Sequence, residues 1–139
     1  STLQLGIAER AKGRAYTDLI RAAQALPAHL YIAHNLAALP VAAKAAKYHH
    51  AKCGFDAEDF HRKEVTDDEN SIHYKKCKYL EDKYLPQVDY LTAASPLIAA
   101  EYKKLYPKLN PIVINNVFDS QAHTHPLGVG GHILTRANR

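Results

Sequence analysis

The letters VDYLTAASPLI, residues 88–98, join a short apolar run to the start of a helix. Residues 88–94 have the length and composition of a buried strand. Ser95 then offers a hydroxyl group that can cap a helix, and Pro96 suits the first helical position. The segment therefore predicts a strand that passes directly into a helix.

The same alternation continues along the chain. The other short apolar runs are residues 29–33, 52–55 and 112–114. Helical patterns cover residues 5–26, about 35–48, 70–85 and 95–106. Strands and helices that alternate through short connections are typical of a parallel sheet covered by helices. We therefore expect an α/β fold: a parallel sheet of about four strands with helices on both faces.

Composition excludes several classes of protein. The chain has 139 residues, which suits one domain or a piece of a larger one. With 47% hydrophobic and 23% charged residues, it is neither a disordered tail nor a membrane bundle. Two cysteines, Cys53 and Cys77, are too few for a disulfide scaffold and are expected to be reduced thiols. We expect a cytoplasmic protein.

Polar side chains follow the predicted strands. They are His34, Asn35, Asp56, Glu58, Ser95, Asn115 and Asn116. Ligands of open parallel sheets bind beyond the carboxyl ends of the strands. Free amides at a helix start also favour phosphate or carboxylate groups. The pattern predicts a polar cleft for a sugar or phosphate, although the turns of any α/β sheet would place similar residues there.

Three segments follow one another along the chain: YIAHNLAALP (residues 31–40), CGFDAEDF (residues 53–60) and residues 81–116. In this order they resemble retaining glycosyltransferases built from two Rossmann-like domains (GT-B type, similar to glycosyltransferase family 4). YIAHNLAALP, residues 31–40, resembles their strand, His-Asp-Leu and Leu-Pro helix, with Asn35 in place of Asp. CGFDAEDF, residues 53–60, resembles the next strand and its loop. Residues 81–116 resemble a later signature, and PIVINNVFD, residues 111–119, resembles the proline, apolar strand and Asn that follow in that signature.

The resemblance implies a fold and an activity. Residues 1–119 would be part of the Rossmann-like acceptor-side domain, and residues 120–139 an irregular tail. The intact enzyme would move a sugar from a nucleotide-sugar donor to an acceptor hydroxyl with retention, without a cofactor or an obligatory metal. Donor contacts belong mainly to a second domain that is missing here, so this chain alone is not expected to transfer sugar.

The resemblance also implies roles for the polar residues, although no catalytic residue is assigned. His34, Asn35, Asp56 and Glu58 would contact the acceptor, a saccharide or a lipid-linked glycan. Capping residues would form the cleft floor, namely Ser95, Asn115 and Asn116. A lipid-linked acceptor would bring the protein to a membrane surface as a peripheral protein.

Other interpretations remain open. A metal could be bound by His61, Glu64 and His73 together with the carboxylates near them in sequence, Asp56, Glu58 and Asp59. Residues 57–69 are better interpreted as a solvated acidic loop or lid. Lysines and tyrosines alternate in residues 74–83 and 102–108, yet solvated helix faces explain them more simply than nucleic acid, which we do not expect as a partner.

A different class of function is also open. The chain could be a small non-catalytic α/β module that binds a ligand or nucleotide. The glycosyltransferase interpretation predicts instead an exposed sheet edge, through which two copies could form a homodimer.

Overall fold

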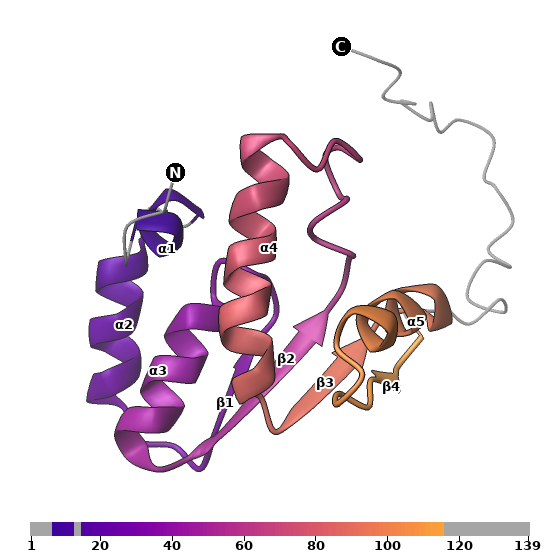
Figure 1. Cartoon of the computed structure of the whole chain (residues 1–139). Coiled ribbons are helices and arrows are strands. Elements are labelled where there is room, and N and C mark those ends of the chain that lie inside the picture. Colours follow the sequence, from indigo (N-terminus) through magenta and orange to yellow (C-terminus); the bar gives the residue numbers. More distant parts are fainter. Residues whose placement is uncertain (1–6, 13–14, 116–139) are drawn as a thin grey trace, which may run out of the picture.

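Four short strands form one parallel sheet in the computed structural model, which describes residues 7–12 and 15–115 (Figure 1). The strands are β1 (Leu30–Ala33), β2 (Lys52–Ala57), β3 (Tyr90–Ala93) and β4 (Ile112–Val113). They lie side by side in chain order, β1-β2-β3-β4, and every neighbouring pair is parallel. The predicted α/β class and the four parallel strands are confirmed.

Helices precede the first strand and connect the later ones, as the pattern predicted. They are α1 (Ile7–Lys12), α2 (Tyr16–Ala25), α3 (Leu39–His49), α4 (Ile72–Tyr84), the 3-10 turn η1 (Leu85–Gln87) and α5 (Pro96–Leu105). The single helix expected over residues 5–26 is instead divided into α1 and α2. Gly13 lies between the two in the sequence, and glycine is a poor helix former.

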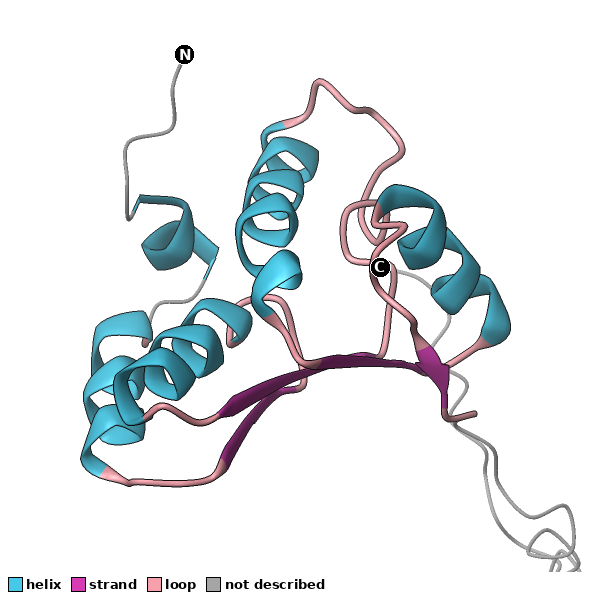
Figure 2. Ribbon diagram, turned by 60° about the horizontal axis from the view of Figure 1, so that its bottom comes forward, coloured by secondary structure: helices cyan, strands magenta, loops and turns pink. Residues whose placement is uncertain are grey.

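All the described helices lie on one face of the sheet (Figure 2). Crossovers between parallel strands are right-handed in nearly all proteins. Each strand lies on the same side of the strand before it, from β1 to β4. Right-handed crossovers therefore place α3, α4 and α5 on one face of the sheet. The expectation of helices on both faces is therefore wrong for the described residues.

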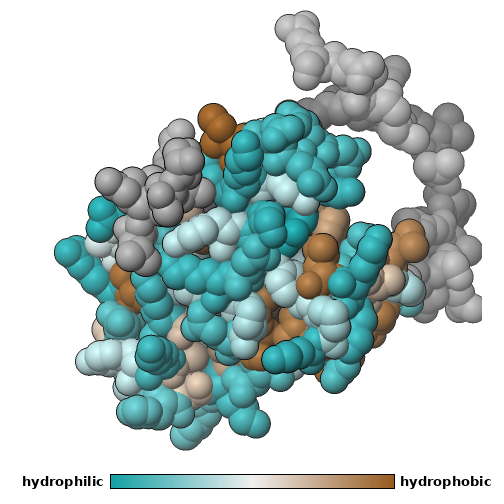
Figure 3. Space-filling model, viewed as in Figure 1, coloured by the Kyte–Doolittle hydropathy of each residue, from teal (hydrophilic) through white to brown (hydrophobic). Residues whose placement is uncertain are grey.

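The hydrophobic core lies between the helices and the covered face of the sheet. Phe55 and Leu91 point into it from β2 and β3, and each is at most 1% exposed. They meet Leu39, Leu80 and Tyr102, which come from α3, α4 and α5 and are fully buried. The outer surface of this helical layer is mainly hydrophilic (Figure 3).

The opposite face of the sheet is called the bare face here, because no described helix covers it. Leu30 and Ile32 alternate along β1 with Tyr31 and Ala33, which pack against or within the core, so they point to this side. Ile112 points there too, because its register partner Thr92 alternates with the core residue Leu91. Leu30, Ile32 and Ile112 are 40%, 45% and 55% exposed. Parallel sheets are usually buried on both faces, so an apolar face of this kind is unusual.

A buried ion pair anchors the segment between β2 and α4. Arg62 is 3% exposed, and its Nε donates to Oε2 of Glu81 on α4 at 2.6 Å. Its Nη2 also donates to the hydroxyl of Tyr106, just beyond α5, at 2.6 Å. Burial raises the pKa of Glu81, and Arg62 opposes that shift. Residues 57–69 are therefore not a solvated loop throughout, because His61 and Arg62 are buried.

Other local expectations have mixed outcomes. The helix expected to begin at Asn70 is capped by Ser71, whose hydroxyl accepts from the amide of Tyr74 at 3.1 Å. Cys53 and Cys77 are both buried, and Sγ of Cys77 lies 3.4 Å from Nε2 of His73. None of the described helices has the length and hydropathy that crossing a membrane requires. The predicted boundary at residue 119 and the tail 120–139 lie outside the described residues.

We expect Arg62→Met to lower the free energy of unfolding by about 3–5 kcal/mol, because the buried Glu81 carboxylate would lose its cation. Urea denaturation followed by circular dichroism measures the change. Arg21→Met is the control, since it removes only the exposed pair with Asp18 at 3.9 Å and should change little.

A double variant separates the ion pair from packing. Arg62→Met combined with Glu81→Leu should recover most of the loss, because no unpaired charge then remains buried. A single Arg62→Met variant as stable as the unaltered protein would contradict the anchoring role.

Candidate functional site

Three strands bring polar side chains together at their carboxyl ends. The register pairs Ala33 with Phe55, so the next residues, His34 and Asp56, stand beside each other. Asp56 is also paired with Thr92 on β3. His34, Asp56 and Thr92 therefore form a row across the sheet on the bare face. Side chains alternate between the two faces of a strand, so the face that carries Asp56 also carries Glu58.

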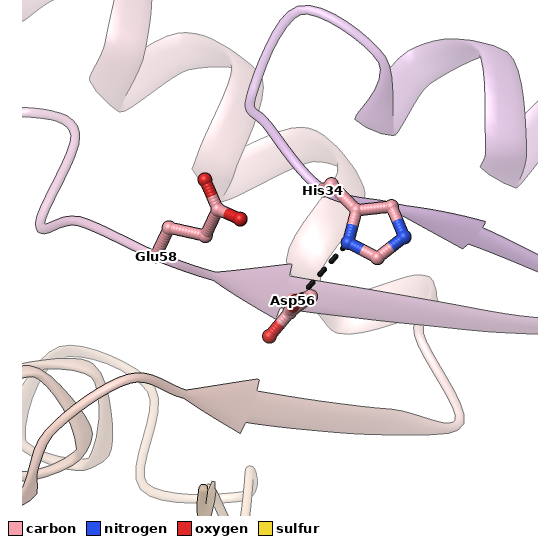
Figure 4. Close-up of side chains that lie close together, drawn as sticks. All are labelled: His34, Asp56 and Glu58. Carbon is pink, nitrogen blue, oxygen red and sulfur yellow. Dashed lines mark hydrogen bonds and ion pairs between the residues drawn. The ribbon is translucent and has the colours of Figure 1, made fainter. Parts of the chain in front are cut away.

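Asp56 connects the row through both carboxylate oxygens, and Figure 4 shows the contact with His34. Its Oδ1 accepts from the hydroxyl of Thr92 at 2.6 Å. Its Oδ2 lies 3.1 Å from Nδ1 of His34. A neutral imidazole with its proton on Nδ1 donates to Asp56 and leaves Nε2 as a hydrogen-bond acceptor. Asp56 can thus fix the tautomer and the orientation of His34.

These side chains line a cleft of about 450 Å³. The volume lies within the range of about 300–1,000 Å³ that is usual for small-molecule sites. Besides His34, Asp56 and Glu58, the lining includes the apolar Ile32 and Ile114. The cleft therefore combines an apolar wall with a few convergent polar groups, as sites for small ligands generally do.

Two of the three predicted asparagines, Asn35 and Asn115, lie within the described residues and have different positions. Oδ1 of Asn35 accepts from the amide of Ala38 at 3.0 Å and closes the turn that leads into α3. Asn35 is thus engaged with the backbone next to His34. Asn115 lines the cleft, as the prediction of a cleft-floor residue requires. Asn116 lies outside the described residues.

Ser95 is the N-cap of α5, as its sequence predicted. Its hydroxyl accepts from the amide of Ile98 at 3.3 Å, and Pro96 occupies the first turn. Ala94, the residue before it, lines the cleft instead. The hydroxyl of Ser95 therefore has a structural partner beside the cleft.

A metal ion could be held by the same side chains. Among the described residues, one group brings three metal-binding atoms within 4.8 Å of one another: His34, Asp56 and Glu58. One imidazole nitrogen with two carboxylate oxygens suits a divalent ion such as Mn²⁺ or Zn²⁺.

The alternative metal-binding set, namely His61, Glu64 and His73, is arranged differently. Nδ1 of His61 pairs with Glu64 at 3.2 Å, while Nε2 of His73 lies 3.3 Å from the backbone oxygen of His61. His73 therefore faces a carbonyl group there, and the three side chains do not converge on one point.

Among the cleft residues that sequence reasoning missed, two carry hydroxyl groups, Tyr90 and Thr92. Both belong to β3, which the sequence predicted, and they are two residues apart. The alternation of side chains therefore placed them on one face, but the sequence did not show that this face was bare.

Neither the protein-family models nor the curated proteins that were searched contain a match to this chain. The geometry of the cleft is therefore the basis for assigning a function.

We expect Ser95→Ala to lower the free energy of unfolding by about 1 kcal/mol through loss of the helix cap, without changing ligand binding in the cleft. Ser71→Ala removes the matching cap of α4 and should cost a similar amount. Thermal unfolding measures both. Weaker ligand binding in the Ser95 variant alone would place its hydroxyl in the site.

Proposed function

We propose that the chain is the acceptor-side part of a retaining glycosyltransferase and that the cleft beyond β1 and β2 receives the acceptor. The observation that supports this most directly is the pairing of His34 with Asp56 beside Glu58. Two carboxylates and an oriented imidazole can together accept hydrogen bonds from several hydroxyl groups of one sugar.

The proposed reaction joins the acceptor oxygen to the anomeric carbon of the donor sugar. The bond from that carbon to the nucleoside diphosphate breaks, and the proton of the acceptor hydroxyl moves to the departing phosphate oxygen. Nε2 of His34, with its ring held by Asp56, accepts a hydrogen bond from this hydroxyl and orients its oxygen. Glu58, which is exposed in the cleft, accepts from a neighbouring hydroxyl.

The nucleotide-sugar donor is proposed to bind mainly to a second domain that is not part of this chain. Negative charge develops on the leaving phosphates, and helix starts or basic groups can stabilise it. The acceptor is proposed to be a saccharide or a lipid-linked glycan, met in the cytoplasm or at a membrane surface. The exposed edge strand β1 remains the proposed contact for a homodimer.

A non-catalytic ligand-binding module is the second candidate. It is favoured by one observation: the cleft of about 450 Å³ combines the apolar Ile32 and Ile114 with convergent polar groups, as sites for small ligands generally do. Such a module would bind its ligand without any need for a second domain. The two candidates therefore differ in whether binding leads to transfer.

We expect His34→Ala to lower the rate of sugar transfer by about 100-fold in the natural gene product, because acid–base or orienting groups typically contribute that much. Radiolabelled UDP-glucose, UDP-galactose and GDP-mannose are the donors, and labelled glycan is the product measured. His29→Ala is the matched control: this exposed histidine precedes β1, at the opposite end of the strand.

The outcomes separate the candidates. Transfer that survives in His34→Ala at the level of the control removes His34 from the site. No transfer from any donor, together with saccharide binding in the cleft, favours the binding module. Absence of both transfer and saccharide binding contradicts the glycosyltransferase proposal.

A further inference from the structure

Gly54 occupies the middle of β2 on the bare face, where its register partner is Tyr90 of β3. A Cβ atom on Gly54 would collide with Cζ, Oη and Cε1 of the Tyr90 ring. The far end of the ring therefore lies directly over the backbone of Gly54. Glycine inside a strand often marks a close approach of this kind. Gly54 is buried although no described helix covers its face, because the ring covers it.

Tyr90 also lines the cleft that contains His34, Asp56 and Glu58. The ring is half-buried: one side meets the sheet at Gly54, and the remainder borders the cleft. Burial raises the pKa of its hydroxyl, and the charge of Asp56 raises it further. The hydroxyl therefore stays protonated at neutral pH and the ring remains uncharged.

The ring and the polar row have a spacing that suits one sugar. Tyr90 and Gly54 stand two residues before Thr92 and Asp56 on their strands, which corresponds to about 7 Å along the sheet. A single hexose ring spans a similar length. Ile32 lies beside Gly54 in the register and extends the apolar surface.

We propose that Tyr90, held over Gly54, is a stacking platform for the ring of a saccharide acceptor. The face of an aromatic ring carries partial negative charge, and the C–H groups on the apolar face of a sugar meet it favourably. Asp56 and Glu58 then receive hydroxyl groups at the far end of the same ring. This assignment rests on the proposed function. It adds that the cleft recognises the sugar ring of the ligand.

The test measures binding of methyl glycosides of glucose, galactose, mannose and N-acetylglucosamine to the full chain, by calorimetry and saturation-transfer NMR. Tyr90→Ala should weaken the tightest of these by about tenfold or more, equal to about 1.4 kcal/mol. Tyr90→Phe keeps the ring and should stay within about threefold of the unaltered chain. Tyr48→Ala is the control, since Tyr48 is an exposed tyrosine of α3 outside the cleft.

Gly54→Ala gives an independent test, because it leaves Tyr90 in the sequence but pushes its ring off the sheet. We expect the same loss of binding as in Tyr90→Ala. Circular dichroism checks that this variant folds. If it does not, Tyr90→Trp provides a second readout: the chain has no tryptophan, so the new indole reports sugar binding by a shift in its emission.

The results distinguish this inference from the proposed function. Loss of binding in Asp56→Asn but not in Tyr90→Ala or Gly54→Ala would overturn the platform and leave the acceptor cleft in place. Equal weakening of binding by Tyr90→Phe and Tyr90→Ala would also overturn the platform and leave the acceptor cleft in place, because the hydroxyl would then be the recognised group. Failure of every glycoside to bind the unaltered chain would overturn both proposals.

Discussion

The strand order determines which face of the sheet the helices cover and which face stays bare. Right-handed crossovers and the order β1-β2-β3-β4 bring α3, α4 and α5 to one side. That side becomes the core, where Phe55 and Leu91 are almost completely buried. The other face keeps apolar side chains such as Ile32 in solvent. Within the described residues, the cleft forms where this bare face meets the polar carboxyl ends of the strands.

The ion pair between Arg62 and Glu81 holds the segment that leaves the cleft. Removing two charges from water is costly, and the cost is met only when geometry and additional hydrogen bonds are good. Both conditions hold here, because the 2.6 Å contact is supplemented by the hydroxyls of Tyr102 and Tyr106. The segment after β2 is thus fixed to two helices. Glu58 is the first residue of this segment, four residues before Arg62.

Much of the fold could be predicted from the sequence, whereas the pairing of side chains could not. The strands and the Ser95 cap follow from local patterns of apolar residues, hydroxyls and proline. The contact of His34 with Asp56 depends on the register between two strands, which local patterns do not specify. The burial of Arg62 was missed for a similar reason, since its partner Glu81 lies nineteen residues away on another element.

Strand β2 joins the core and the cleft in a single stretch of chain. Phe55 faces the helices, while Gly54 and Asp56 on either side of it point to the bare face. A shift of the register by one residue would exchange the two sets, placing a carboxylate in the core and a phenyl ring in the cleft. The cost of burying an unpaired charge opposes such a shift. The same alternation that builds the core therefore also keeps the glycine under Tyr90 and the carboxylate beside His34.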